Sequence, residues 1–528
     1  MSKGNPTMQR RAFLRNMEAA AAGSILGRQA TAGERNDRET PERPIKNILF
    51  FFVDQHRRDS IGCYGNPVVR TPNIDRLAAN GMRFTNAYTP APVCTPARMS
   101  VQCGLWPHKH RLIFNTHNAA QKGGQDDPDP SVSFFSETLR DHGWNTGHIG
   151  KWHIGTEPNK PANRGYDDLP YYPGYGIPNN IYGYKRNRRT HPHYGAYLKD
   201  LGLDGFNLLS MKREDGTLFS GLQEGPAEAS IPSYLANQAI EKIGEYTSSD
   251  TPFFLSCHFW GPHAPYCIPD PYYSMYRGAD IDPWPSFDCD LSDKPQVLRR
   301  YGDYLGTDWF TRERIAGLIG EYYGYISLID HEMGRVIKAL DDAGELDRTL
   351  IIYSADHGST VGAYRMWDKG YGMYDAITGV PLIMSHPSIR PGDSDAFVTL
   401  LDLMPTFLNA AGLETPENID GSSLMPILDG SRGSVRDDYI VTEHHGHHCP
   451  FWQRMVRTKS GKYIFNYTAC HEFYDLESDP HETRNIIDSV DKKTLDRYED
   501  MLLTWQDETK DPLTNWVRCS VDETVFPY

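Results

Sequence analysis

The chain has 528 residues, of which 39% are hydrophobic and 12% aromatic. This composition excludes a disordered protein, and the length suffices for two domains or for one large α/β domain with an appendage. The formal net charge of −15 at pH 7 argues against general binding to nucleic acid or to a membrane surface, and no stretch reaches the roughly 18 apolar residues of a membrane-spanning helix.

Residues 1–32 have the features of a twin-arginine export signal. Two arginines at 10–11 precede a short apolar stretch at 19–26, and Ala-Thr-Ala at 30–32 offers a cleavage site of small residues. We therefore expect an exported protein, periplasmic or extracellular, with a polar linker at residues 33–44. The alternative interpretation is a basic tail without structure.

Export would allow disulfides to form among the nine cysteines. Cys257 and Cys267 are close enough in sequence to be joined across a loop. The pairing of cysteines cannot be deduced from sequence. Free buried thiols are an equally good interpretation.

Four largely apolar runs predict strands that are buried on both faces of a sheet: residues 45–53, 252–257, 349–354 and 380–384. Helical patterns lie between them, at 74–80 and most clearly at 312–343, which Gly344 ends. This alternation predicts an α/β fold with a large, mainly parallel mixed sheet sandwiched by helices. In such folds ligands bind beyond the carboxyl ends of the strands.

The pattern changes near residue 435. Short strand patterns at 438–443, 453–458 and 461–466 are followed by a helical pattern at 491–507. They predict a smaller α+β subdomain over residues 435–528, carrying a short antiparallel sheet. The stretch 156–235, rich in Pro, Gly and Tyr, is predicted to form long surface loops of the kind that often carry specificity.

Two dipeptides at predicted strand ends are candidate metal ligands: Asp54-Gln55 and Asp356-His357. Their three oxygen donors and one nitrogen suit a hard cation such as Ca²⁺ or Mg²⁺, while the imidazole leaves Mn²⁺ or Zn²⁺ open. Either pair alone is weak evidence for a metal site, because an aspartate at a strand end is more often a turn or capping residue.

The segment Pro92-Val93-Cys94-Thr95-Pro96-Ala97-Arg98 resembles the signature of the formylglycine-dependent (type I) sulfatases of the alkaline phosphatase superfamily. In that family Cys-x-Pro-x-Arg directs oxidation of the cysteine to an aldehyde. Further stretches match the family in order, at 71–77, 143–153, 262–265, 356–358, 402–406 and 473–476. The resemblance covers about residues 45 to 490, and so many ordered matches exclude coincidence.

The resemblance implies a sulfuric ester hydrolase whose catalytic domain spans residues 45–434. The cofactor would be Ca²⁺, with Mg²⁺ or Mn²⁺ as alternatives, and a maturation enzyme would convert Cys94 to formylglycine. The implied metal ligands are Asp54, Gln55, Cys94, Asp356 and His357. The implied catalytic residues are Cys94, Arg98, Lys151, His153, His263 and Lys369.

The chemistry explains why such groups are needed. A hydrated aldehyde carries two hydroxyls on one carbon, so one can attack sulfur and loss of the proton from the other can expel sulfate. By resemblance, Arg98 would hold this hydrate, Lys151 would bind sulfate and His153 would take the proton. His263 and Lys369 would clamp the sulfate and the bridging oxygen. Gln55 and His357 depart from the Asp and Asn common in the family, which lowers the negative charge of the predicted metal site.

Two basic clusters are candidate specificity determinants. The first lies in the long loops and includes Arg186, Arg188, His191 and His193. The second includes His444 and His445 of the C-terminal subdomain. The alternatives are a solvated loop and a His-rich turn without function.

We expect the substrate to be a sulfated small molecule or glycan. A phosphodiester or phosphonate monoester hydrolase of the same superfamily is the first alternative. A catalytically inactive relative that binds sulfated glycans is the second.

Overall fold

The computed structural model describes residues 45–116, 123–156, 159–167, 171–172, 192–203, 208–212 and 218–521. The predicted export signal, the linker and the specificity candidates Arg186, Arg188 and His191 lie outside these residues. Arg43–Tyr528 groups into one folded unit by its internal contacts. Among the described residues, no helix combines the length and apolar character needed to span a membrane.

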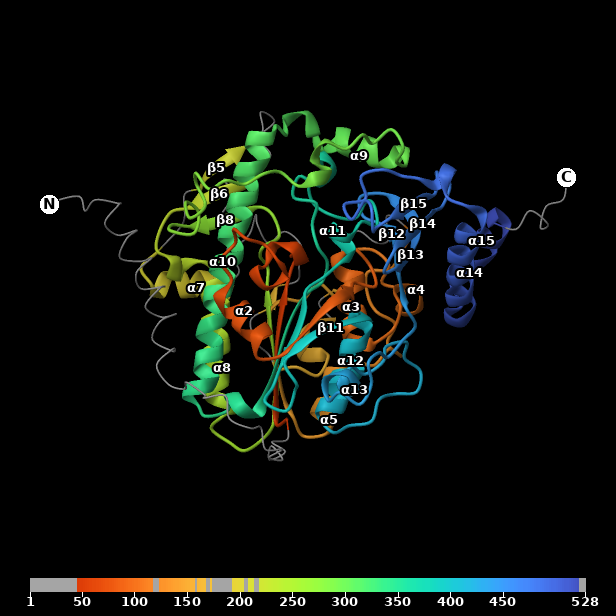
Figure 1. Cartoon of the computed structure of the whole chain (residues 1–528). Coiled ribbons are helices and arrows are strands. Elements are labelled where there is room, and N and C mark those ends of the chain that lie inside the picture. The colour runs from red at the N-terminus through yellow and green to blue at the C-terminus, as the bar shows by residue number, and fades with distance from the viewer. Residues whose placement is uncertain are drawn as a thin grey trace, which may run out of the picture. The chain divides into compact units, whose positions relative to one another are not determined.

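An eight-stranded sheet forms the centre of the fold (Figure 1). Its order is β11 (Gly392–Thr399), β2 (Met82–Tyr88), β10 (Leu382–Ser385), β9 (Thr349–Ala355), β1 (Asn47–Val53), β7 (Phe253–Phe259), β3 (Asn145–Lys151) and β4 (Tyr171–Tyr172). Only β10 runs antiparallel to its neighbours among the paired strands. The prediction of a mainly parallel mixed sheet is confirmed, and all four apolar runs lie in it.

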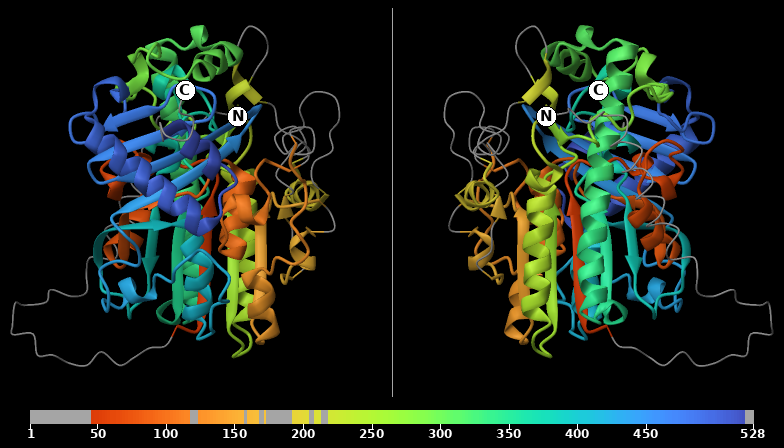
Figure 2. Two further views of the ribbon diagram at one scale, coloured as in Figure 1. Left: turned by 90° about the vertical axis from the view of Figure 1, so that its right-hand side faces the viewer. Right: turned by 90° about the vertical axis from the view of Figure 1, so that its left-hand side faces the viewer.

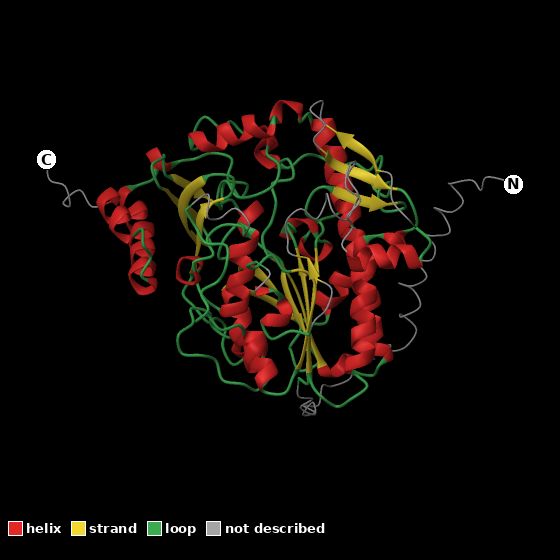
Figure 3. Cartoon of the chain, turned by 180° about the vertical axis from the view of Figure 1, so that it is seen from behind, coloured by secondary structure: helices red, strands yellow, loops and turns green. Residues whose placement is uncertain are grey.

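Helices cover both faces of this sheet (Figures 1 and 3). One layer contains α2 (Pro72–Ala79), α8 (Ile231–Tyr246) and α10 (Arg312–Asp342), and α8 lies beside α10 (Figure 2). The other contains α3 (Cys94–Cys103), α5 (Phe135–Asp141), α12 (Leu403–Ala410) and α13 (Met425–Leu428). The predicted helices at 74–80 and 312–343 are confirmed within one or two residues, and the Thr311 side chain caps α10 by accepting from Arg314 N.

Aromatic rings fill the layer between the sheet and α5 and α12. The ring of Phe407 lies 5.2 Å from Phe50, 4.9 Å from Phe135 and 5.1 Å from Phe254, measured between centroids. All four side chains are at most 1% exposed. Because Phe50 lies on β1 and Phe254 on β7, this cluster holds the two central strands against the helices.

The C-terminal region carries a four-stranded antiparallel sheet, as predicted. It consists of β12 (Tyr439–Gly446), β13 (Pro450–Thr458), β14 (Gly461–Asn466) and β15 (Glu472–Asp475), with α14 (Lys492–Thr509) and α15 (Thr514–Val521) beside it. Val441, Val456 and Tyr463 pack there with Leu502 and Trp505 of α14.

The prediction of loops over residues 156–235 is wrong in part. The described residues there include α7 (Pro192–Asp200), β5 (Leu208–Lys212), β6 (Leu218–Gln223) and the start of α8; β5 and β6 join β8 (Tyr266–Pro269) in a small sheet. His193, a specificity candidate, falls within α7. The start of α8 was not predicted because it contains Pro232, although proline is well tolerated in the first turn of a helix. The Ser230 side chain caps that turn.

All nine cysteines lie in described residues and all are free thiols. Cys257 and Cys267 are each fully buried. The interpretation as buried thiols is therefore the one that holds for this pair.

The aromatic cluster predicts a strong dependence of stability on Phe407. Phe407→Ala should lower the free energy of unfolding by about 3–5 kcal/mol, because the cavity lies between rigid strands and cannot collapse. Leu201→Ala, at a side chain that is 44% exposed, should change it by less than about 0.5 kcal/mol. Urea unfolding followed by tryptophan fluorescence measures both, and equal shifts would contradict this account of the core.

Candidate functional site

The predicted metal ligands follow strands that end at the same edge of the sheet. Asp54 follows β1, and Asp356 and His357 follow β9, which is paired with β1 in parallel. The Asp356 carboxylate ties the two ends together, since its Oδ1 accepts from Gln55 N at 3.0 Å. The same atom accepts from His357 N at 2.9 Å. Asp54, Asp356 and His357 have no exposed surface.

Cys94 is the first residue of α3 and points at these groups. Its Sγ lies 3.2 Å from His357 Nε2 and 3.9 Å from Asp54 Oδ1. Burial and Asp54 raise the pKa of Cys94, but Lys151, Lys369 and His357 outweigh both and leave that pKa lowered. The start of a helix also favours negative charge. The position therefore stabilises an anionic side chain at residue 94.

Arg98 lies one helical turn beyond Cys94 and joins three strands. Its Nε donates to Asp356 Oδ2 at 2.8 Å, its Nη1 donates to the Lys151 carbonyl at 3.0 Å, and its Nη2 lies 3.5 Å from Asp54 Oδ2. Nη2 is buried and makes no hydrogen bond to a described residue. One donor of this arginine is therefore available to a group bound beside Asp54.

Asp54 also forms a buried ion pair with Lys151, the last residue of β3. Burial raises the pKa of Asp54, but the nearby Lys151, His263 and Arg98 lower it by more. The pKa of Asp54 is therefore well below its ordinary value. The Lys151 ammonium lies 4.4 Å from the centroid of the Trp260 ring, which closes one side of this group.

Lys369 and His263 form a second cationic group at the site. Lys369 Nζ lies 2.5 Å from His263 Nε2 and donates to Gln55 Oε1 at 3.1 Å. His263 Nδ1 lies 2.6 Å from the Ala264 carbonyl, so it carries the proton and Nε2 accepts from the lysine. Burial and the Lys369 charge lower the pKa of His263 to about 3. Lys369 is therefore the proton-bearing partner of the pair.

His153 is buried in the same region, and residues 151–153 do not form an extended segment. The φ of His153 is 58°, so the chain turns there. The turn lets the His153 carbonyl accept from the Thr95 hydroxyl at 2.8 Å, beside Cys94. Gln55 has a φ of 63°, and such backbone conformations are concentrated at functional sites.

The donor set fits a divalent cation. One ligand atom each from Asp54, Cys94, Asp356 and His357 lies within 4.8 Å of the others. The amide oxygen of Gln55, the fifth predicted ligand, accepts from Lys369 Nζ at 3.1 Å. Two buried carboxylates provide the negative charge and the hard oxygen atoms that such an ion requires.

His444 and His445 differ in their surroundings. His444 is buried and its Nδ1 lies 3.0 Å from Gln453 Oε1, which makes it part of the packing of β12 against β13. His445 lines a separate cavity. Neither residue hydrogen-bonds a catalytic candidate.

Two further histidines of the C-terminal run, His447 and His448, lie beside the residue that precedes Lys369. Their ring nitrogens group with the Asp368 carboxylate within 4.8 Å, and Lys369 Nζ lies 3.1 Å from Asp368 Oδ1. A lysine so close disfavours a metal ion at this group. Tyr304, which is 72% exposed on α9 (Gln296–Leu305), lies 5.8 Å from the His448 ring. The only sequence signal for Asp368 was its place directly before Lys369.

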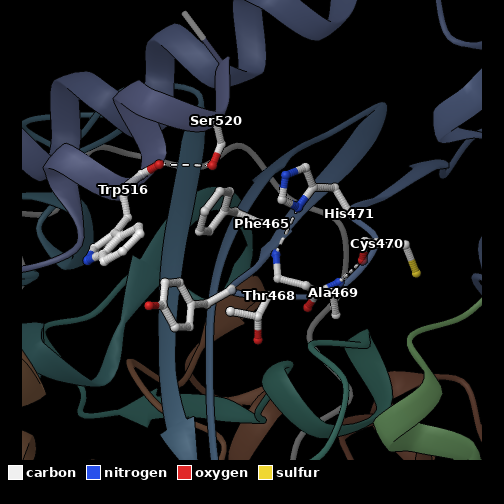
Figure 4. A pocket seen from close by; sticks show the side chains of 9 residues that line it. Phe465, Thr468, Ala469, Cys470, His471, Trp516 and Ser520 are labelled. Atoms are coloured by element: carbon white, nitrogen blue, oxygen red, sulfur yellow. Dashed lines mark hydrogen bonds between the residues drawn. The ribbon is translucent and has the colours of Figure 1, made fainter. Parts of the chain in front are cut away.

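The cavity in Figure 4 is not this site. It has a volume of about 580 Å³ and lies between β14, the loop that follows it and α15. Its lining includes His471, Trp516 and Ser520 but no lysine, arginine or acidic residue. A catalytic site for an anionic substrate needs positively charged side chains, and none lines this cavity.

Gly150 should be necessary for the position of Lys151. Its φ is 96°, and a Cβ there would lie 2.0 Å from the His258 carbonyl oxygen. Gly150→Ala should lower stability by about 3 kcal/mol, from backbone strain plus overlap, and should reduce the catalytic rate by displacing Lys151 and Arg98. Gly143→Ala is the matched control, since its φ is 83° but nothing lies within 4 Å of the added atom. Equal losses of stability in the two variants would contradict the steric argument.

Comparisons with known proteins agree with this geometry. Residues 46–413 match the family model described as Sulfatase, and residues 362–506 match that described as N-sulphoglucosamine sulphohydrolase, C-terminal. The chain is 28% identical over 485 residues to the uncharacterized sulfatase YidJ of Escherichia coli (strain K12), with 89% of each chain covered. It is 26% identical over 501 residues to the N-acetylglucosamine-6-O-sulfatase of Bacteroides thetaiotaomicron, covering 85% of this chain and 83% of that one.

Among solved structures, the phosphonate monoester hydrolase of Agrobacterium radiobacter superposes with a TM-score of 0.72 at 23% identity, covering 88% of this chain and 96% of that one. This likeness shows the fold alone. The Sulfatase model, by contrast, spans more than half of the chain and includes Cys94 and every candidate catalytic residue. The chain therefore belongs to the sulfatase family and is a sulfuric ester hydrolase.

Proposed function

We propose that this protein is an exported glycan sulfatase, which removes sulfate from a carbohydrate with a formylglycine made from Cys94 and a divalent metal. The convergence of Cys94, two buried carboxylates and the cations Arg98, Lys151 and Lys369 carries the proposal. The similarity to an N-acetylglucosamine-6-O-sulfatase supports a sugar as the alcohol part of the substrate. Residues 1–32 would direct export.

Asp54, Gln55, Asp356 and His357 would hold the metal, with Ca²⁺ as the expected ion and Mg²⁺ or Mn²⁺ as alternatives. A bound divalent ion draws electrons from sulfate oxygens and favours ionisation of a neighbouring hydroxyl. The mostly oxygen donors support a hard ion. The chain's own cations surround Asp54 and keep the pKa of its carboxyl low, which favours the ionised form that a metal ion binds.

The modified side chain of residue 94 would supply a hydroxyl nucleophile from a hydrated aldehyde. Both oxygens of that group would be bonded to Cβ of residue 94, so the Cys94 Sγ marks the approximate position of one of them. Arg98 Nη2, the donor without a described partner, would hydrogen-bond one of them, while Arg98 Nε keeps Asp356 in position. His153, buried beside Thr95, would accept the proton of the second hydroxyl when sulfate is released.

Lys151, Lys369 and His263 would receive the sulfate ester. The two ammonium groups neutralise its negative charge, and the charge that develops on the bridging oxygen as the S–O bond breaks. That oxygen keeps the bonding electron pair and takes a proton from Lys369, because Lys369 holds the proton it shares with His263. Overall, ester and water give alcohol and hydrogen sulfate.

The nucleophile assignment predicts the effect of removing Cys94. Wild-type protein verified by mass spectrometry to carry formylglycine should release sulfate from at least one member of a panel of sulfated oligosaccharides. Cys94→Ala should lose at least about 10³-fold in rate, as expected when a covalent nucleophile is removed. Cys103→Ala, at the other end of the same buried helix, should retain modification and activity.

Phosphodiester and phosphonate monoester substrates belong in the same panel. Faster release from either of them than from every sulfate ester would overturn the assignment as a sulfatase. Binding of glycans without any turnover would instead support an inactive relative.

The metal site predicts a stability effect that does not depend on turnover. Saturating Ca²⁺ at about 100 times its Kd should stabilise the chelator-treated protein by about 2.7 kcal/mol. Asp356→Asn should abolish most of this gain, because the site loses half of its carboxylate charge. Asp393→Asn, at an exposed ion pair on β11, should keep it. Scanning calorimetry with Ca²⁺, Mg²⁺ and Mn²⁺ measures the gain, and an unchanged response in Asp356→Asn would exclude the site.

A further inference from the structure

A second cavity lies between the segment after α4 (Pro107–His110) and the hairpin of β12 and β13. Its volume is about 250 Å³. We name it the Trp452 cavity after the side chain that distinguishes it, and its lining includes His108, Arg111, Ile113, Gln125, His445 and Trp452. None of the proposed catalytic or metal-binding residues lines it.

His445 is the buried polar group that faces this cavity without a satisfied partner. It is 2% exposed, and its Nδ1 has no hydrogen-bond partner among the described residues. Its Nε2 lies 3.5 Å from Glu443 Oε2, longer than a good hydrogen bond. Buried polar side chains are nearly always hydrogen-bonded, so this imidazole points to a polar ligand.

The acidic groups behind the cavity are already matched within the protein. Glu443 accepts from His108 N and lies 2.8 Å from His108 Nδ1. Arg454 pairs with Asp511 at 2.7 Å and lies 3.4 Å from Glu443. Arg111 forms no salt bridge within the described residues, and its backbone has a φ of 68°. Asp129 interacts electrostatically with Arg111 but forms no salt bridge with it, so the lining offers a ligand a positive charge that no direct contact neutralises.

Trp452 adds an apolar surface. Its half-buried indole meets the His445 ring edge to face, with 4.9 Å between the ring centroids. An aromatic ring beside hydrogen-bonding groups suits a sugar ring, which has apolar C–H faces and hydroxyls at its edge. A free inorganic anion would use the arginine but not the indole.

Both walls of the cavity lead to the proposed catalytic site. Asn115, two residues after Ile113, accepts from the backbone N of Thr95 at 3.0 Å, beside Cys94. On the other wall, His447 follows His445 by two residues and packs on Gly370, next to Lys369. One oligosaccharide could therefore contact both places.

We propose that the Trp452 cavity is a carbohydrate subsite for an anionic sugar unit that adjoins the sugar being desulfated. The inference rests on the proposed glycan sulfatase function. The indole stacks on the sugar ring, His445 hydrogen-bonds a hydroxyl, and Arg111 pairs with a carboxylate or a second sulfate.

Binding to Cys94→Ala protein tests the subsite without turnover. Titration calorimetry would compare a hyaluronan tetrasaccharide (uronate, no sulfate), a κ-carrageenan tetrasaccharide (sulfate, no uronate) and neutral chitotetraose. At least one anionic probe should bind about 10-fold more tightly than chitotetraose, and Arg111→Gln should remove that preference. Trp452→Ala should weaken all binding about 10-fold or more.

Two matched variants serve as controls. Trp516→Ala, at a 55% exposed indole, and Arg390→Ala, at an exposed arginine, lie away from the cavity lining and should leave binding unchanged. Arg111→Gln changes an exposed side chain, so it tests the proposal even if Trp452→Ala unfolds. Binding that is equal for anionic and neutral probes, or equally weakened in the controls, would overturn the subsite.

Turnover by the formylglycine form gives a second readout. In Arg111→Gln, kcat/KM for the anionic oligosaccharide should fall about 10-fold, mainly through KM, while 4-nitrophenyl sulfate stays within about twofold. Equal losses on both substrates would mean that Arg111 has only a structural role and would overturn the subsite. If no glycan is desulfated but the binding pattern holds, the proposed function fails, and the cavity is a binding site for an anionic carbohydrate without a role in desulfation.

Discussion

Two carboxylates buried side by side at the ends of β1 and β9 are the constraint on which the rest of the site depends. Asp54 and Asp356 have no exposed surface, and unpaired charges in such a place would oppose folding strongly. Arg98 resolves part of this by reaching Asp356 and approaching Asp54, and Lys151 pairs with Asp54. Because Arg98 lies on α3, these ion pairs also fix Cys94, the first residue of that helix.

The charge balance indicates what the site can accept. The negative groups Asp54, Asp356 and Asp368 are matched by Arg98, Lys151 and Lys369 before any metal or substrate binds. A divalent ion would add two positive charges to this balanced group. A singly charged ester and an ionised nucleophile together would neutralise them. Sulfate esters and phosphonate monoesters meet this condition equally, so a similar fold can serve both, whereas a dianionic phosphate monoester would not be matched.

Much of the fold follows from sequence because buried parallel strands leave a strong signal. The runs at β1, β7, β9 and β10 and the long helix α10 were predicted closely. The elements between residues 192 and 246 were not, because short amphipathic pieces among Pro, Gly and Tyr have little periodicity. The candidate catalytic residues came from a family resemblance, and the structure brings Cys94 together with both aspartates and with Lys151.

The C-terminal histidines show where pattern alone fails. Six consecutive residues from Glu443 to His448 present four histidines, and nothing in the sequence separates their surroundings. In the structure the strand β12 alternates, so His444 packs against Gln453 while His445 faces a cavity. The bend at Gly446, whose φ is 128°, then carries His447 to Lys369. Asp368 and Tyr304 join that group only through the tertiary fold, which no local spacing reveals.

The position of β12 is fixed by the same segment that leads into Cys94. Glu443 N donates to the Pro90 carbonyl at 2.9 Å, and the Thr442 hydroxyl donates to the Thr89 carbonyl at 2.8 Å. Behind them, the charged groups of His108, Glu443, Arg454 and Asp511 satisfy one another and are buried or nearly so. The end of β12 is therefore anchored to the segment that leads into the catalytic helix, while residues 448–450 beyond it are exposed. Substitutions in that outer stretch can change which sugar the cleft admits without moving Cys94.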